Sequence, residues 1–265
     1  MELLLGFVIA LAISLTGVGA GSMTTPLLIL LLGASPATAV GTALTFGAVV
    51  KLASVPVYAL RRQVNLRVLR LLLAGGLPGV LAGAFLLDRL KREPYSGVLY
   101  VALGTLIAAT AAFHLYRVFR PRPQPSNSNR SRLLPWFAFP IGAEVGFSSA
   151  GAGALGSLLL LALTPLTAAE VIGTDLCFGL GVSLIGSVIQ LGAGNYDAAL
   201  LLKLIVGGLC GALAGSMLAG RIAQRPLRVG LLLVLILLGC QLALHGYSLS
   251  PALNVHAALQ SPRLR

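Results

Sequence analysis

Long apolar stretches separated by short polar turns fill most of the chain. No charged residue occurs between Leu3 and Val50, a stretch that can hold two bilayer-spanning helices of about 20 residues each. The apolar runs are continuous rather than alternating, which favours helices over the strands of a membrane barrel. The pattern therefore predicts an all-α polytopic membrane protein with about eight apolar segments. These segments cover approximately residues 3–32, 37–60, 69–88, 95–118, 133–163, 166–194, 198–220 and 227–249.

Two of these segments are longer than one membrane crossing requires, and each is interrupted by a glycine-rich sequence. Residues 3–32 contain Thr16-Gly-Val-Gly-Ala-Gly-Ser22, and residues 133–163 contain Gly146-Phe-Ser-Ser-Ala-Gly-Ala-Gly153. Glycine weakens the interior of a helix. Helix breaks at matching places in the two halves of a chain are typical of the binding site of a secondary transporter. We therefore expect the first segment of each half to be broken or re-entrant and to lie close to a binding site.

The sequence repeats itself at a constant offset, so that position n of the first half corresponds to position n + 132 of the second. Gly19-Ala-Gly21 recurs as Gly151-Ala-Gly153, and the run Gly75–Arg89 recurs as Gly207–Arg221 with nine of fifteen positions identical. An offset that does not change between blocks indicates one duplication, with two homologous halves of four segments each. The predicted units are an N-terminal membrane repeat (1–119), a linker (120–132), a C-terminal membrane repeat (133–250) and a short tail (251–265).

Other glycines recur at every fourth position on one face of a helix. Small residues on one face allow membrane helices to approach closely, so these two stripes predict helix packing rather than ligand binding. The stripes are Gly75, Gly79 and Gly83 in the first half, and Gly207, Gly211 and Gly215 in the second.

Basic residues gather between the apolar segments, as the positive-inside rule describes for a multi-pass protein of the plasma (inner) membrane. The Pro-, Ser- and Arg-rich linker 120–132 is therefore predicted to be exposed and cytoplasmic. If all eight segments cross the membrane, the two halves are parallel. If the broken segments are re-entrant, each half crosses three times and the halves are inverted. The charge distribution favours inversion, because the basic loops 61–70, 117–132 and 221–228 then share one side and only 89–92 disagrees.

Three ionisable residues lie well inside apolar segments, where a charge costs about 2.5–3.5 kcal/mol on insertion scales. Lys51 could attract an anionic substrate, whereas Asp175 and Glu144 could carry a coupling proton. The alternative is that Lys51 pairs with Asp175 or Glu144 only to lower the cost of burying both charges.

Glycines and hydroxyl groups near the breaks indicate the class of ligand. A broken helix offers free backbone N–H groups with the positive end of a helix dipole, and such ends bind small oxyanions. Broken-helix carbonyls can also hold a cation, so this preference for anions is modest. The predicted substrate-binding residues are Gly19, Gly21, Ser22, Thr24, Gly41, Thr42, Lys51, Gly151, Gly153, Gly173 and Thr174, and Thr25 could add another donor.

Other classes of protein fit poorly. The net charge of +12 is spread over loops and forms no basic face with interleaved aromatic residues, so nucleic acid is not an expected partner. The three histidines and three cysteines are isolated in the sequence, which predicts neither a catalytic arrangement nor a metal site or other cofactor. We therefore expect no enzyme, and a lipid bilayer as the surrounding medium.

At these residues the chain resembles the TauE/SafE family of sulfite and organosulfonate exporters, also called the toluene-sulfonate-uptake-permease family. The resemblance covers nearly the whole chain and implies an inner-membrane permease of two duplicated four-segment halves. It also implies transport of sulfur-containing or related organic anions, linked to protons. In the second half, Ala154 replaces Ser22 and Leu158 replaces Pro26, so the two halves need not contribute equally. The matching sequences are Gly17-Val-Gly-Ala-Gly-Ser22, Pro26-Leu-Leu, Val40-Gly-Thr42, Gly151-Ala-Gly153 and Ile172-Gly-Thr-Asp175.

The sequence thus predicts a secondary-transport permease that moves a small anion, sulfite or an organosulfonate, by alternating access between two repeats. A transporter of another substrate class, such as a metal cation, is the first alternative. A non-transporting membrane scaffold is the second, although a scaffold would not require matching helix breaks in both halves.

Overall fold

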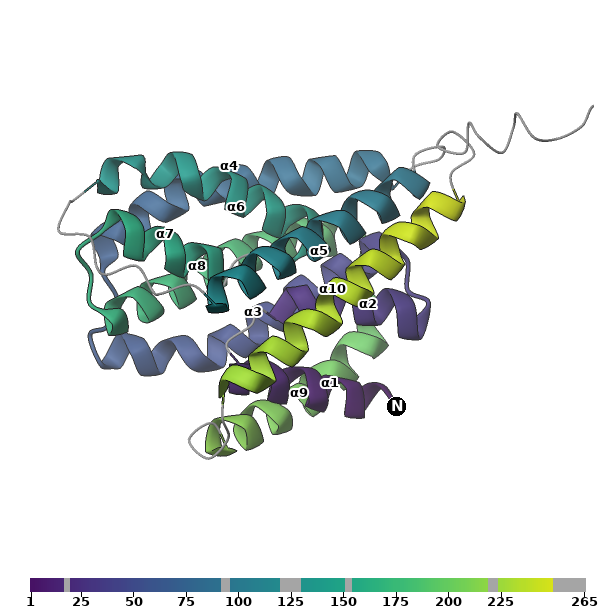
Figure 1. The fold of residues 1–265 in the computed structure, drawn as a ribbon, viewed down its shortest axis with the longest axis horizontal. Coiled ribbons are helices and arrows are strands. Elements are labelled where there is room, and N and C mark those ends of the chain that lie inside the picture. The colour runs from purple at the N-terminus through teal and green to yellow at the C-terminus, as the bar shows by residue number, and fades with distance from the viewer. Residues whose placement is uncertain (17–19, 92–95, 120–129, 151–153, 219–223, 250–265) are drawn as a thin grey trace, which may run out of the picture.

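The computed structural model describes residues 1–16, 20–91, 96–119, 130–150, 154–218 and 224–249, and its regular structure within these ranges is entirely helical (Figure 1). The first half of the chain contains α1 (Glu2–Thr16), α2 (Ala20–Leu32), α3 (Pro36–Leu60), α4 (Leu66–Leu90) and α5 (Ser96–Phe119). The second half contains the short 3-10 helix η1 (Ser131–Leu133), α6 (Leu134–Ser148), α7 (Ala154–Leu163), α8 (Ala168–Gly192), α9 (Ala198–Leu218) and α10 (Gln224–Leu249).

Six of the described helices are long and apolar enough to cross a bilayer, namely α3, α4, α5, α8, α9 and α10. The predicted all-α polytopic architecture is therefore confirmed, with six candidate spans among the described residues. The two overlong apolar segments supply none of the six. Each of them instead divides into two shorter helices, α1 with α2 and α6 with α7.

The broken segments fold back on themselves. The backbone N–H of Arg130, just before η1, donates to the carbonyl of Leu163 at the end of α7 over 3.0 Å. The pair α6–α7 therefore begins and ends at the same side of the bundle. In Figure 1, α2 likewise runs back toward the side on which the N-terminus lies.

Helices α3 and α8 cross in opposite directions. Near the start of α3, Gly41 packs against the backbone carbonyl of Asn195, which follows α8. Beyond the end of α3, the carbonyl of Gln63 packs against Gly173 in the early turns of α8. Because the start of each helix meets the end of the other, α3 and α8 are antiparallel.

Five of the six stripe glycines mediate close helix packing, as predicted. In each contact a glycine of one helix faces a backbone carbonyl of the next helix, so an added Cβ would collide with main chain. Glycines of α4 face main-chain carbonyls of α6, and glycines of α9 face main-chain carbonyls of α1. The pairs are Gly75 with Pro135, Gly79 with Phe139, Gly83 with Ala143, Gly207 with Leu3, and Gly211 with Phe7.

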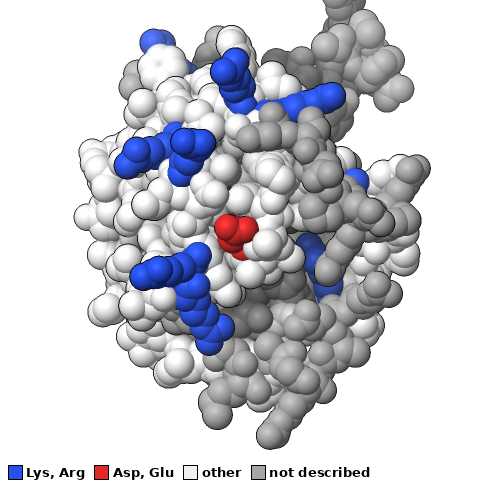
Figure 2. All heavy atoms as spheres, turned by 90° about the vertical axis from the view of Figure 1, so that its left-hand side faces the viewer, with Lys and Arg blue, Asp and Glu red and all other residues white. Residues whose placement is uncertain are grey.

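One end of the bundle is strongly basic, as Figure 2 shows. We call this the basic end; it holds the α3–α4 connection, η1 and the α7–α8 connection. The Asn65 N–H donates to the Thr174 hydroxyl (3.0 Å) and so joins the α3–α4 connection to the early turns of α8. The opposite end holds the α2–α3, α4–α5 and α8–α9 connections, which meet where Lys91 donates to Asn195. Described arginines at or near the basic end are Arg61, Arg62, Arg67, Arg70, Arg130 and Arg132.

Candidate functional site

The flanks of the two glycine-rich breaks touch each other. The hydroxyl groups of Thr25 in α2 and Ser149 after α6 are hydrogen-bonded, with 2.6 Å between the oxygens, and both residues are buried. The Ser149 hydroxyl also donates to the Gly21 carbonyl over 3.2 Å. Gly21 lies so close to the Ser149 main chain that a Cβ could not be accommodated. Ser149 itself has a left-handed backbone (φ 61°), which ends α6 at this contact.

The predicted residues Gly19, Gly151 and Gly153 lie outside the described residues. Of their neighbours, Thr24 is completely buried in α2 and Ser22 is half-buried. Among the described residues, the contact between the two breaks is formed by Gly21, Thr25 and Ser149.

Lys51 lies at the middle of the α3–α8 crossing. Its Nζ donates to the Ser183 hydroxyl over 2.8 Å and to the Gly179 carbonyl over 3.2 Å. A Lys ammonium has three N–H donors, so these two partners leave one donor for another group. The charged end of Lys51 is thus held inside the protein between two helices, where a lone charge in lipid would be costly.

Asp175 lies in α8, one turn before Gly179, and is 5% exposed. Its Oδ2 accepts a hydrogen bond of 2.5 Å from the Ser157 hydroxyl of α7. Its Oδ1 is buried and has no hydrogen-bond partner among the described residues. That oxygen lies against Gly156, where a Cβ would collide with it. One carboxylate oxygen is therefore bonded to α7, and the other is buried against Gly156 without a hydrogen-bond partner among the described residues.

Lys51 and Asp175 interact electrostatically without direct contact. Their opposite charges influence each other. The ion pairs found among the described residues nevertheless join Lys91 to Asp88 and Lys203 to Glu2, not Lys51 to Asp175. Each of the two central charges is instead hydrogen-bonded to a serine, Lys51 to Ser183 and Asp175 to Ser157.

Glu144 lies away from these two charges. Its carboxyl group interacts with the Thr110 side chain of α5, and its buried Oε1 has no hydrogen-bond partner among the described residues. The structure therefore places the two predicted carboxylates in different surroundings, Asp175 beside α7 and α3, and Glu144 beside α5.

The predicted glycine–threonine pairs lie at opposite ends of the α3–α8 crossing rather than beside Lys51. The Thr174 hydroxyl accepts from the Asn65 N–H at the basic end, whereas the Thr42 hydroxyl accepts from the Asp197 N–H (3.4 Å) at the opposite end. Gly41 and Gly173 make the close backbone contacts described above. At 1.5 Å of rise per residue, Thr42 is about 13 Å along α3 from Lys51. These four residues contact the neighbouring connections at the two ends of the crossing.

Three serines that bond to the predicted site residues are absent from the sequence-based list: Ser149 contacts Gly21, Ser157 contacts Asp175, and Ser183 contacts Lys51. The repeat offset contained a signal for two of them. Ser157 is the repeat counterpart of Thr25, and Ser183 is the repeat counterpart of Lys51. Comparison of polar residues between the halves would therefore have found both serines, whereas Ser149 has no such signal.

Comparisons with known proteins agree with this architecture. The family model described as sulfite exporter TauE/SafE matches residues 2–242. The chain is also similar to the protein "Probable membrane transporter protein YjnA" of Bacillus subtilis (strain 168), with 27% identity over 249 residues, 91% of this chain and 98% of the relative. No solved structure matches the chain. The match over nearly the whole length identifies a membrane transporter rather than an enzyme, and the chain belongs to the sulfite exporter TauE/SafE family.

Proposed function

We propose that the protein is a secondary transporter that moves a small anion, sulfite or an organosulfonate, by alternating access around Lys51. The observation that carries the proposal is the position of the Lys51 ammonium, which lies at the crossing of α3 and α8 and, among the described residues, uses two of its three N–H donors. An ammonium fixed inside a helical membrane protein attracts anions and repels cations. The substrate class rests on this charge together with the family to which the chain belongs.

Inverted repeats account for the arrangement of helices. Helices α1, α3 and α4 begin at Glu2, Pro36 and Leu66, and α6, α8 and α9 begin at the repeat counterparts of these three residues. The contact of Asn65 with Thr174 likewise recurs as the contact of Asp197 with Thr42 when each residue is exchanged for its counterpart in the other half. If a two-fold axis relates the halves, the antiparallel crossing of α3 and α8 fits an axis perpendicular to these helices and within the membrane plane. Alternating access between such repeats is a common mechanism of secondary transport.

Charge balance favours coupling of the anion to a proton. Lys51 and a deprotonated Asp175 together carry no net charge. A monovalent anion bound at Lys51 leaves one negative charge in a medium that solvates charge poorly, and a proton taken up by Asp175 restores neutrality. The buried and unpartnered Oδ1 of Asp175 is the atom on which this proton would reside. Glu144, with its own unpartnered oxygen, is a second candidate for proton transfer.

The basic end is assigned to the cytoplasm of a plasma-membrane protein by the positive-inside rule. The linker 120–132 leads into α6 in the sequence and is assigned to the same side. This orientation places the α4–α5 and α8–α9 connections on the outer side. The chain units then correspond to an N-terminal repeat (1–119), the linker, a C-terminal repeat (133–250) and a tail (251–265).

The direct test is flux into proteoliposomes that contain the full-length protein. The assay measures sulfite, benzenesulfonate, benzoate and a divalent cation, each with and without an inward proton gradient. We expect saturable flux of at least one sulfur oxyanion and greater accumulation with the gradient. Flux of the cation without flux of any anion would reverse the substrate assignment, and no flux of any probe would contradict transport of this class.

A further inference from the structure

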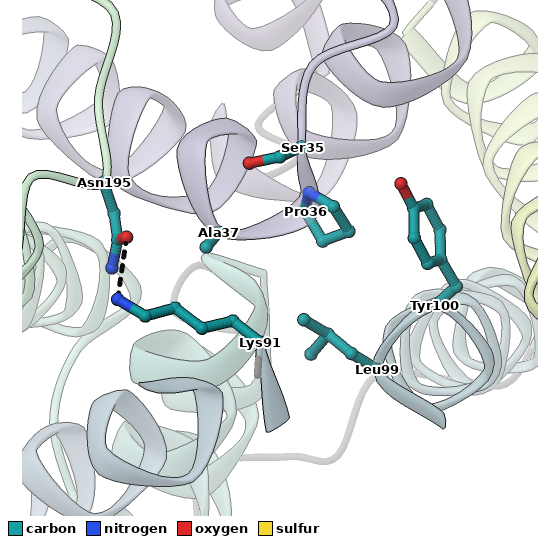
Figure 3. A pocket seen from close by; sticks show the side chains of 7 residues that line it. All are labelled: Ser35, Pro36, Ala37, Lys91, Leu99, Tyr100 and Asn195. Carbon is teal, nitrogen blue, oxygen red and sulfur yellow. Dashed lines mark hydrogen bonds between the residues drawn. The ribbon is translucent and has the colours of Figure 1, made fainter. Parts of the chain in front are cut away.

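A cavity of about 440 Å³ opens at the end of the bundle opposite the basic end. We call it the Lys91 pocket (Figure 3). Its polar wall consists of Ser35, Lys91, Tyr100 and Asn195. Its apolar wall consists of Pro36, Ala37 and Leu99 together with the ring of Tyr100. These residues come from the α2–α3, α4–α5 and α8–α9 connections and the first turns of α3 and α5, so both halves of the chain build the pocket.

Lys91 supplies a positive charge that the fold holds in place. Its Nζ contacts Asp88 Oδ1 at 2.6 Å and donates to Asn195 Oδ1 over 3.1 Å. Asn195 is only 7% exposed, and its Nδ2 donates to the Oε1 of the fully buried Gln190 over 2.6 Å. A buried amide pair thus positions the lysine, unlike a solvated surface lysine. The third N–H of the ammonium is available to a ligand.

The start of α3 adds to the positive potential. Ser35 precedes the helix, and its hydroxyl accepts from the Thr38 N–H over 3.3 Å. Pro36 and Ala37 form the first turn of this 25-residue helix and line the pocket. The N-terminus of a helix carries a partial positive charge, so the helix and Lys91 act on a bound anion in the same sense.

The charge distribution along the chain gives an independent reason to assign a role to Lys91. Among the described residues, the basic residues of the α3–α4 connection and η1 lie at the basic end, whereas Arg89 in the last turn of α4 and Lys91 lie at the opposite end. This exception to the positive-inside trend is explained if a cation at this end serves to bind an anion.

We infer that the Lys91 pocket is a second anion site, which binds a small organic anion with one charged head and a compact apolar body. The head lies at Lys91 and the body lies between Pro36, Leu99 and the Tyr100 ring. A bare inorganic oxyanion leaves the apolar wall unused, and a fully apolar ligand leaves Lys91 unused. The role of the pocket as an entry site for the transported anion rests on the proposed function. Binding of an anion at equilibrium does not require transport and can be tested separately.

The test measures equilibrium binding of benzenesulfonate, benzoate and sulfite to the full-length protein in lipid nanodiscs. Lys91→Gln removes the charge at nearly constant size and should weaken benzenesulfonate binding about tenfold or more, the loss expected for a charge-assisted hydrogen bond. Lys203→Gln is the matched control, because Lys203 also forms a single ion pair (2.7 Å to Glu2 Oε2) and is half-exposed but does not line the pocket. The affinity of the Lys203→Gln protein for benzenesulfonate should stay within about twofold of the native value.

Asp88→Asn provides a test in the opposite direction. Removal of the carboxylate that competes for Lys91 should tighten binding, and this gain does not depend on the folding of the Lys91 variant. Benzenesulfonate should bind more tightly than sulfite, because only benzenesulfonate uses the apolar wall. Benzoate binding of similar strength supports recognition of the charge and the ring, whereas benzoate binding as weak as sulfite binding overturns a site for organic anions in general.

Binding in the Lys51→Met protein separates this inference from the proposed function. Lys91-dependent binding should persist in that variant even if transport is lost. Unchanged affinity in both Lys91→Gln and Asp88→Asn would overturn the pocket, as would tighter binding of sulfite than of benzenesulfonate. Loss of all binding in Lys51→Met but not in Lys91→Gln would identify the surroundings of Lys51 as the binding site and exclude the Lys91 pocket.

Discussion

Lys51 and Ser183 occupy equivalent positions of the sequence repeat, and they are hydrogen-bonded to each other over 2.8 Å. Two residues at equivalent positions of related halves can meet only close to the axis that relates those halves. If the halves are related as proposed, the Lys51 charge lies close to the axis between them, and the second half has Ser183 in the equivalent place.

Replacement of Lys51 by methionine removes the ammonium group and keeps an unbranched side chain that is one atom shorter. We expect Lys51→Met to lose anion flux by about tenfold or more, because the charge-assisted contact to the anion is gone. Ser183→Ala removes one partner of Lys51 and should reduce flux less. The measurement is the initial rate in proteoliposomes, with Lys203→Met as the control. Native flux in Lys51→Met would exclude Lys51 from substrate binding.

Replacement of Asp175 by asparagine separates coupling from translocation. The amide still accepts the hydrogen bond from Ser157 but cannot exchange a proton. We expect Asp175→Asn to abolish proton-driven accumulation and to preserve exchange of labelled for unlabelled anion. Loss of both activities in a protein of native thermal stability would contradict a role limited to coupling.

The double variant Lys51→Met/Asp175→Asn distinguishes function from mere charge compensation. If the two charges only stabilise each other, each single change leaves an uncompensated buried charge and lowers stability by about 3–5 kcal/mol, and the double change restores both stability and flux. If both residues act in transport, the double variant is stable and inactive. Thermal unfolding and flux of the three variants decide between these outcomes.

The close contact of α4 with α6 predicts a strong effect of side-chain volume at Gly79. A Cβ at this position would meet the carbonyl of Phe139 and the N–H of Ala143, which are main-chain atoms that cannot rotate away. Gly79→Val should destabilise the protein by about 1–3 kcal/mol or more. Gly230→Val in α10 is the matched control, because nothing lies within 4 Å of a Cβ there. Equal thermal stability of the two variants would contradict the packing.

Apolar length and glycine spacing predicted the helices well. The interval 37–60 predicted α3, and the glycine stripe beginning at Gly75 predicted the face on which α4 packs. Both properties depend on local sequence. The partners of buried charges were harder to predict, because the bond from Lys51 to Ser183 depends on how α3 crosses α8. Thr42 and Thr174 show the same difficulty, since their hydroxyl groups satisfy backbone N–H groups of neighbouring connections rather than face Lys51.

Inverted repeats make a specific demand on Asn65 and Asp197, which are counterparts in the sequence repeat. The two residues immediately precede α4 and α9, respectively, and lie at opposite ends of the bundle. Parallel repeats would place them on the same side of the membrane.

Cysteine labelling in intact cells tests this relationship. In a background in which Cys177, Cys210 and Cys240 are replaced by alanine, single cysteines are introduced at the exposed residues Arg62 and Asp197. A membrane-impermeant maleimide should label Asp197→Cys from outside and should label Arg62→Cys only after permeabilisation. Arg130→Cys should behave as Arg62→Cys does, because both lie at the basic end. Labelling of Arg62→Cys and Asp197→Cys from the same side would exclude inverted repeats. Labelling of Arg62→Cys from outside and of Asp197→Cys only after permeabilisation would still support inverted repeats, but with the opposite orientation in the membrane. The orientation is predicted from the positive-inside rule alone, whereas inversion is predicted from the antiparallel crossing of α3 and α8.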